Sequence, residues 1–281
     1  MKNEILRLLF RYSMSKSIFD KEAINRLYNI FIDNYYNIDK NLKSIEIVND
    51  DNVDGIYRHT DKTIRLNINN IVFQMEDEIE RLKLFDIQKY FYFNIQILLS
   101  LFHELEHARQ LDIALGKSLY SIIIFYGKTF GISGNKDNNS LEYKNYVNEL
   151  YLSTYKYNPC ERGAYIESSR IVGDIIKDEF YIDKNIINYL EWLLLSKKIS
   201  GYNIKNDRII APCDTFFSMI DMSLLWESFP FYCDNDKIMY SDVKKNYTLD
   251  ERLKYGFPIS NFEYKRLVNS TNKLKNKILK R

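Results

Sequence analysis

The sequence predicts an α+β protein that is mostly helical, with a small antiparallel sheet packed on one central helix. Apolar residues recur at three- to four-residue spacing over much of the chain, which is the period of amphipathic helices. Between residues 44 and 68 the period changes to alternation, as in half-buried strands. Residues 90–115 are apolar on nearly all sides, which is typical of a helix at the centre of a domain.

The N-terminal part of the chain supplies the first helices and the strands. Residues 1–36 are predicted to be helical, with Asp20 suited to an N-cap. Residues 44–48 (SIEIV) alternate, and residues 55–68 (GIYRHTDKTIRLNI) form two alternating runs around a polar centre. β-branched and aromatic residues on both sides of such a centre predict a β-hairpin.

The rest of the chain is predicted to be mainly helical. A helix over residues 75–115 is expected to end at Gly116. Asn158 as N-cap, followed by Pro159 at the first helical position, predicts another helix start. After residue 115 the predicted segments are a loop at 127–140, helices at 141–156, 158–180 and 185–200, the last ended by Gly201, and a capped helix with a glycine stop and a proline turn within 248–260.

Composition narrows the class of protein. A formal net charge of +2 over 281 residues argues against nucleic acid or a membrane as the main partner. An odd number of cysteines, 3 in all, without a CxxC pair indicates a reducing compartment. The longest apolar runs fall short of the roughly 20 residues that span a bilayer. A cytoplasmic protein is expected, and the basic end of the chain, residues 265–281, favours a solvated helix end over a nucleic-acid-binding tail.

The strongest chemical pattern is HELEH at residues 103–107, which uses two of the 3 histidines of the chain. Residues four apart on a helix lie on one face, so His103 and His107 can reach one zinc ion at about 2.0–2.1 Å. Glu104 can then act as general base toward a water molecule on that ion. Two core histidines would show the same pattern, but burying unpaired polar groups costs about 1–3 kcal/mol each. A metal would remove that cost for the histidines.

A third ligand has to come from elsewhere, because no histidine follows His107. Catalytic zinc sites often combine two histidines with one glutamate, and Glu161 is the best candidate. It lies in the first turn of the helix after Pro159, and the small residues Gly163 and Ala164 would let that helix pack closely. A glutamate in a first turn also stabilises the helix dipole, so a purely structural role is the alternative.

Other ligands and one further catalytic residue stay open at this point. The remaining ligand candidates are His59, a cysteine, Glu167 and Glu142. Cys160 points about 100° away from Glu161 around the helix, so both cannot easily bind one ion. Tyr165 lies one turn after Glu161 and is a candidate donor to the oxyanion of a tetrahedral intermediate, although the chain has 23 tyrosines.

These residues together resemble the zincin metallopeptidases, in particular the small gluzincin-like domains of the ImmA/IrrE type in bacterial and phage proteins. The shared order is a helix, the hairpin at 55–68, HELEH, and a later helix with a glutamate. The resemblance implies that His103, His107 and Glu161 bind Zn²⁺ and that Glu104 is the general base. It also implies a peptide or protein substrate, added as a strand along residues 62–68.

The resemblance covers roughly residues 20–180. It implies a zincin-like domain at residues 1–180 and leaves residues 181–281 as a helical C-terminal extension without a known counterpart. Two departures are the long gap before Glu161 and a tyrosine, Tyr165, where thermolysin-like enzymes have an acidic residue. A zinc metallopeptidase is the favoured reading. The alternatives are a non-catalytic, metal-stabilised interaction or regulatory module of a bacterial or mobile-element protein, and a nucleic-acid-associated protein.

Overall fold

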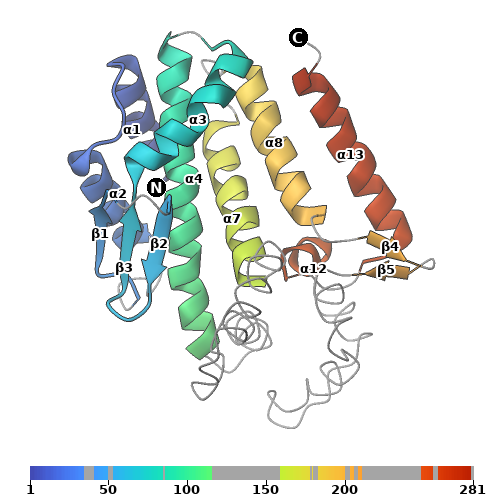
Figure 1. The fold of residues 1–281 in the computed structure, drawn as a ribbon. Helices are drawn as coiled ribbons and strands as arrows, with labels where there is room; N and C mark the ends of the chain where they lie inside the picture. Colours follow the sequence, from blue (N-terminus) through green and yellow to red (C-terminus); the bar gives the residue numbers. More distant parts are fainter. Residues whose placement is uncertain are drawn as a thin grey trace, which may run out of the picture. The chain divides into compact units, whose positions relative to one another are not determined.

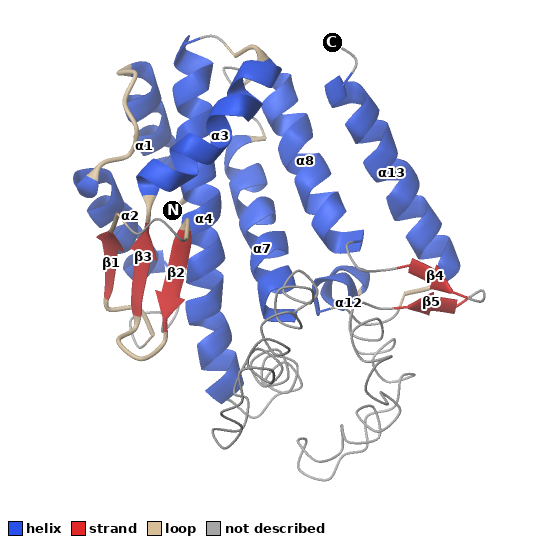
Figure 2. Ribbon diagram, in the orientation of Figure 1, coloured by secondary structure: helices blue, strands red, loops and turns tan. Residues whose placement is uncertain are grey.

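The computed structural model describes residues 1–34, 41–49, 53–84, 86–115, 159–177, 179, 183–199, 203–205, 208–210, 248–255 and 259–279 (Figure 1). These residues form a mostly helical α+β structure with a small sheet, as predicted (Figure 2). Several predicted features lie outside the described residues: the loop at 127–140, the helix at 141–156, the Asn158 cap, and the residues Gly116, Glu142 and Gly201.

Helices account for most of the described structure, and strands come in two small groups. The elements in chain order are α1 (Lys2–Met14), α2 (Lys21–Asn34), β1 (Ser44–Ile47), β2 (Gly55–Arg58), β3 (Thr63–Leu66), α3 (Ile68–Leu82), α4 (Asp86–Leu115), α7 (Pro159–Ile176), α8 (Lys184–Ile199), β4 (Asn203–Lys205), β5 (Arg208–Ile210), α12 (Leu249–Tyr255) and α13 (Asn261–Leu279). None of the helices described is long and apolar enough to cross a membrane.

The chain divides into two compact units, each made of several segments. Unit 1 comprises residues 1–109, 167–194 and 273–281, and unit 2 comprises residues 110–166 and 195–272. Helices α4, α7, α8 and α13 therefore contribute residues to both units. The boundary expected at residue 180 falls between parts of α7 and α8 that belong to unit 1, and the two-domain division stays a prediction.

The three-stranded sheet is mixed, which corrects the expectation of an antiparallel sheet. Strands β2 and β3 form the predicted hairpin and pair antiparallel, whereas β1 pairs with β3 in parallel. Lys62 closes the hairpin turn with a positive φ of 59°, and its N–H donates to the Arg58 carbonyl at 2.7 Å. Parallel pairing is possible because the chain between β1 and β3 passes through β2, so β1 and β3 run in the same direction.

The strand order β1-β3-β2 also corrects the proposed peptide-binding edge. Strand β3 is hydrogen-bonded on both sides, so residues 62–68 cannot receive an added strand. The apolar face of the sheet is buried through Ile45, Tyr57, Ile64 and Leu66. This burial follows the period-2 pattern from which the strands were predicted.

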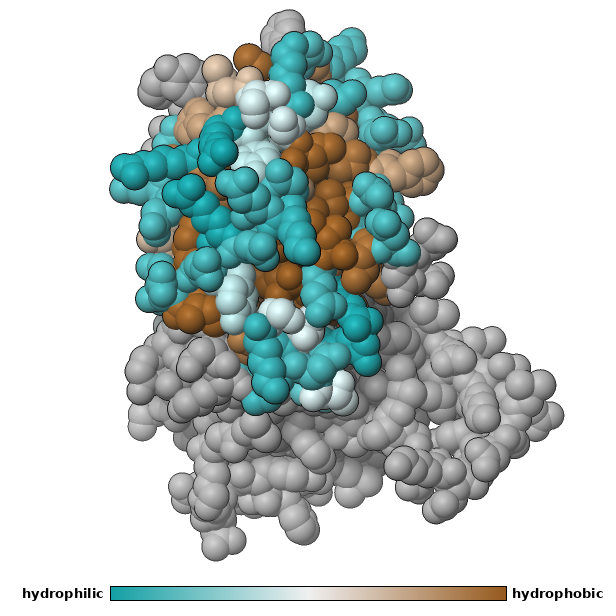
Figure 3. Space-filling model, turned by 90° about the vertical axis from the view of Figure 1, so that its left-hand side faces the viewer, coloured by the Kyte–Doolittle hydropathy of each residue, from teal (hydrophilic) through white to brown (hydrophobic). Residues whose placement is uncertain are grey.

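The opposite face of the sheet is polar, with Arg65 paired to Glu46 and Arg58 paired to Asp61. Figure 3 views the side on which α1, α2 and the sheet lie in Figure 1, and shows an apolar area among hydrophilic residues. Single large apolar side chains also remain exposed in unit 1, of which Phe73 is the most exposed at 73%. Exposed single apolar residues are normal on folded proteins.

The segment predicted as one helix over 75–115 consists of two helices, α3 and α4. Helix α3 begins at Ile68, because the Asn67 side chain accepts a hydrogen bond from the Asn70 N–H and caps the first turn. It ends at Leu82, and the C-cap residue Lys83 adopts the left-handed conformation with φ 52° and ψ 45°. A lysine at this position gives no sequence signal for a helix end, since glycine is the usual residue there.

Helix α4 is the centre of unit 1, as its apolar composition predicts (Figure 1). Phe91 packs on Phe10 of α1, and Phe102 packs on Phe31 of α2, both with ring centroids 5.2 Å apart. The fully buried Asn94 accepts a hydrogen bond from the Phe19 N–H at 2.8 Å, which ties the segment between α1 and α2 to α4. Helix α4, which carries HELEH, is therefore packed against both α1 and α2.

Helix α2 begins as its sequence predicts. The Asp20 carboxylate accepts hydrogen bonds from the Ala23 N–H at 2.9 Å and from the Tyr12 hydroxyl at 2.6 Å. The hydrogen bond from Tyr12, and then that from Ala23, lowers the pKa of Asp20. The carboxylate thus stays ionised as a cap and fixes the start of α2.

After residue 180, the residues that the structure describes are largely helical, as expected, through α8, α12 and α13. Thr248 and Glu251 form a reciprocal cap at the start of α12, since Glu251 accepts from the Thr248 N–H at 2.8 Å and the Glu251 N–H donates to the Thr248 hydroxyl at 3.3 Å. The short antiparallel hairpin of β4 and β5 was not predicted. Strands of three residues are too short to show an alternating pattern.

Candidate metal centre

Helix α4 places polar side chains of the HELEH motif within the protein interior. His103 and Glu104 are each 7% exposed, and His107 is half-buried. Residues on either side of the motif are apolar and fully buried, including Phe102 and Ala108. These polar groups therefore need partners within the protein, because leaving a buried polar group unpaired is costly.

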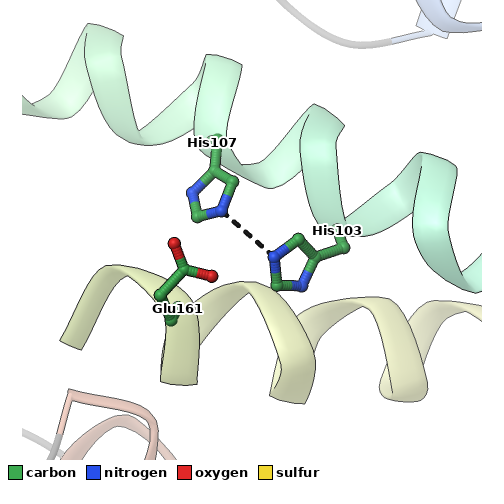
Figure 4. A group of neighbouring side chains, drawn as sticks. All are labelled: His103, His107 and Glu161. Carbon is green, nitrogen blue, oxygen red and sulfur yellow. Dashed lines mark hydrogen bonds between the residues drawn. The ribbon is translucent and has the colours of Figure 1, made fainter. Parts of the chain in front are cut away.

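The two histidines face each other along one side of α4 (Figure 4). Their Nε2 atoms lie 3.1 Å apart. Two nitrogens at about 2.0–2.1 Å from one tetrahedral zinc ion would be roughly 3.3 Å apart, so the two rings already have close to the separation that a shared ion requires. The spacing of four residues, predicted to bring the rings together, is confirmed.

Glu161 completes a group of three possible ligands. It lies in the first turn of α7, is half-buried, and directs its carboxylate toward both histidines (Figure 4). One ligand atom each from His103, His107 and Glu161 lie within 4.8 Å of one another. Two imidazole nitrogens and one carboxylate oxygen form a donor set that fits zinc and leaves a fourth position for water or substrate. Among the described residues this is the group of His, Cys, Asp and Glu side chains that could hold a metal ion.

The other proposed ligands do not join this group. His59 is exposed in the hairpin turn. Glu167 forms an ion pair with Arg170, which lies one turn after it on α7, at 2.6 Å. The side chains of the cysteines and of Glu142 lie outside the described residues.

Glu104 is held by strand β2 beside the histidines. Its Oε2 atom accepts a hydrogen bond of 2.6 Å from the Tyr57 N–H. Its Oε1 atom lies 4.0 Å from the Nε2 atom of His103. One oxygen therefore fixes the orientation of the carboxylate, and the other faces the nitrogen that would bind the ion. This is the arrangement that a general base toward a water molecule needs.

Tyr57 is itself anchored at both ends. Its hydroxyl donates to the Asn41 carbonyl at 2.5 Å, and burial, with a smaller contribution from Asp61, raises its pKa to about 12. The hydroxyl is thus protonated at neutral pH and keeps its hydrogen bond. Because the same residue supplies the N–H that holds Glu104, the position of the carboxylate is fixed by the sheet.

Tyr165, the proposed oxyanion donor, lies on α7 one turn after Glu161. The Lys197 Nζ atom lies 4.0 Å from the centroid of its ring, which is a cation–π contact. The tyrosine is half-buried. Its role in catalysis stays a prediction.

Two supporting features were missed from the sequence. One is the contact of β2 with Glu104, for which Gly55 is a possible signal, because a glycine within a strand often marks a close approach. The other is Arg162, next to Glu161, which is only 1% exposed. Arginine is rarely fully buried, so nothing in the sequence pointed to it.

Comparison of the chain with known protein families, with curated proteins and with solved structures finds no match. The site is therefore defined by its own geometry: a pair of histidines and a glutamate suited to a metal ion, beside an oriented carboxylate.

Substitution of Gly55 by alanine is expected to lower the free energy of unfolding by about 1–3 kcal/mol, the usual cost of overpacking. A Cβ atom at Gly55 would lie 3.1 Å from the Glu104 Cγ and 3.2 Å from the Leu66 Cδ2. The Glu104 side chain cannot move away freely, because its Oε2 accepts a hydrogen bond from the Tyr57 N–H of β2. The measurement is chemical denaturation of the purified variant.

The matched control is Gly173→Ala in α7, where a Cβ atom would meet nothing within 4 Å. Alanine within a helix is favoured over glycine by about 0.5–1 kcal/mol, so this variant should be as stable as the wild type or more stable. Equal unfolding curves for the two variants would contradict a close contact between Gly55 and Glu104.

Proposed function

We propose that the chain is a zinc-dependent metallopeptidase. The proposal rests mainly on one observation: the carboxylate of Glu104 lies beside the His103–His107–Glu161 group with one oxygen fixed by β2 and the other 4.0 Å from His103 Nε2. A metal site that only stabilises the fold has four protein ligands and no need of such a base. Three ligands with an adjacent oriented carboxylate suit hydrolysis instead.

Each residue of the site has a proposed task in this reaction. His103, His107 and Glu161 would hold the zinc ion, which when bound acts as a Lewis acid and lowers the pKa of a water molecule to about 7. Glu104 would accept a proton from that water through Oε1 and return it to the leaving amine. Tyr165 is proposed to donate a hydrogen bond to the developing oxyanion.

The proposed substrate is a peptide or protein bound in extended form along β2. The Tyr57 N–H points away from β3, because it donates to Glu104. Backbone groups alternate in direction along a strand, so the Gly55 N–H and the carbonyls of Gly55 and Tyr57 also face the outer edge of β2, while the Tyr57 N–H is taken by Glu104. An extended peptide at this edge would place a carbonyl near the base. The odd number of cysteines, 3 in all, without a CxxC pair favours action in the cytoplasm.

The test is cleavage of a proteome-derived peptide library by purified protein, with metal content measured on the same sample. About one zinc ion per chain and cleavage that is lost with a chelator and restored by zinc are expected. A library is needed because a single protein such as casein would miss a narrow specificity. Zinc-loaded protein that cleaves none of the library would favour a non-catalytic, metal-stabilised module.

A further inference from the structure

Arg162 follows Glu161 directly and is among the largest fully buried side chains, at 1% exposed. Its guanidinium donates from Nε to the Leu253 carbonyl of α12 at 2.6 Å, and from Nη2 to the Lys198 carbonyl of α8. Both carbonyls lie in the last turn of their helix, where intrahelical donors are lacking. A positive group at the C-terminal ends of helices is also favoured by the helix dipoles.

These contacts fix the rotation of the first turn of α7. Consecutive helical residues point about 100° apart, so a guanidinium held on α8 and α12 sets the direction in which Glu161 points. Gly163 restricts the same turn from another side: a Cβ atom there would lie 3.1 Å from the Gln110 Nε2 and 3.7 Å from the Lys254 Cε. The start of α7 thus has little freedom to turn.

Helix α12 is itself well supported. Lys198 Nζ pairs with Asp250 at 2.8 Å, and Arg252 pairs with Glu263 of α13 at 3.0 Å. Leu253 is fully buried and forms an apolar cluster with Ile259. The Leu253 carbonyl that accepts from Arg162 therefore belongs to a helix held by two ion pairs and by apolar packing.

We propose that Arg162 is a positioning residue for the metal ligand Glu161, and that residues 249–255 support the metal centre through it. This inference rests on the proposed function only for the presence of the metal. It assigns a role to part of the chain that the family resemblance leaves without one. Partners of this kind around a ligand typically contribute about 10–100-fold to metal affinity.

The test is zinc affinity, measured by chelator competition, for Arg162→Met and Arg162→Lys. Methionine removes both hydrogen bonds. Lysine keeps the positive charge but lacks the planar guanidinium that donates to the carbonyls of Leu253 and Lys198. About 10–100-fold weaker binding is expected for the methionine variant. If the methionine variant does not fold, the loss of zinc affinity is measured on Arg162→Lys instead.

Two controls separate positioning from general stability. Tyr12→Phe removes the hydrogen bond that a buried side chain of α1 donates to Asp20 at 2.6 Å, and should lower thermal stability with little change in zinc affinity. In a Glu161→Gln background, the amide oxygen keeps a weaker neutral donor at the third position, and zinc affinity is measured there at higher free zinc. Arg162→Met should weaken zinc binding in this background less than about threefold, because residues acting as one unit are not additive.

The outcomes are distinct. Unchanged zinc affinity in both Arg162 variants, or an equal loss with and without Glu161→Gln, would overturn the positioning role and leave the metal centre standing. A wild-type protein that binds no zinc would overturn the proposed metal centre and this inference together.

Discussion

Replacing Glu104 by glutamine is expected to slow peptide cleavage by about 10²–10⁴-fold, the usual contribution of a general base. Glutamine has the same size, and its amide oxygen can still accept the hydrogen bond from the Tyr57 N–H. The variant should therefore keep the fold, the zinc ion and the melting temperature of the wild type. Only the ability to take a proton from water is removed.

The measurement is a proteome-wide comparison of new protein N-termini in cells that express the wild type or Glu104→Gln. Glu106→Gln is the matched control on the same helix: Glu106 is 4% exposed and pairs with Arg109 at 2.6 Å, away from any proposed role in the reaction. It should reduce stability and leave the cleavage profile unchanged. Identical profiles for wild type and Glu104→Gln, with both proteins zinc-loaded, would leave a non-catalytic module as the better explanation.

Replacing His103 by alanine is expected to reduce the zinc content from about one ion per chain to nearly none, because two ligands are too few for a stable site. Loss of a bound metal also removes its stabilisation, which is about 2.7 kcal/mol when free metal is at 100 times the dissociation constant. Elemental analysis and thermal unfolding of protein expressed with zinc give both values.

The control for this prediction is His59→Ala. His59 is exposed in the hairpin turn, so the same chemical change there should leave zinc content and melting temperature unaltered. Zinc-free protein from both the wild type and His103→Ala would argue against a metal at this place. Equal zinc content in both would move the site elsewhere in the chain.

The histidine pair could be predicted from sequence because its geometry is local. Four-residue spacing on a helix fixes the relation of His103 and His107, and the structure brings their Nε2 atoms to 3.1 Å. The apolar run of α4 also predicts its central place, since the hydrophobic effect leaves no other position for such a helix. The choice of Glu161 as third ligand was less direct, because Glu161 is far from the histidines in the sequence. It depended on the argument that a helix whose first turn is followed by small residues can pack closely against α4.

What could not be predicted depends on contacts between distant parts of the chain. The strand order β1-β3-β2 arises from tertiary packing, and an alternating pattern does not specify which strand lies at an edge. The hydrogen bond from Tyr57 to Glu104 is made by a backbone group that every residue type carries. The break at Lys83 uses a left-handed conformation that lysine rarely adopts.

The position of Glu161 along the chain has a consequence for folding. It lies about 54 residues after His107, so an ion held by both closes a long covalent loop. Such an ion would leave when the chain unfolds, so its stabilisation comes from binding to the folded state alone and grows with the concentration of free metal. The chain, which has 3 cysteines, would thereby link distant segments through a reversibly bound metal ion instead of a disulfide bond. Its conformational stability would then follow the zinc supply of the cell.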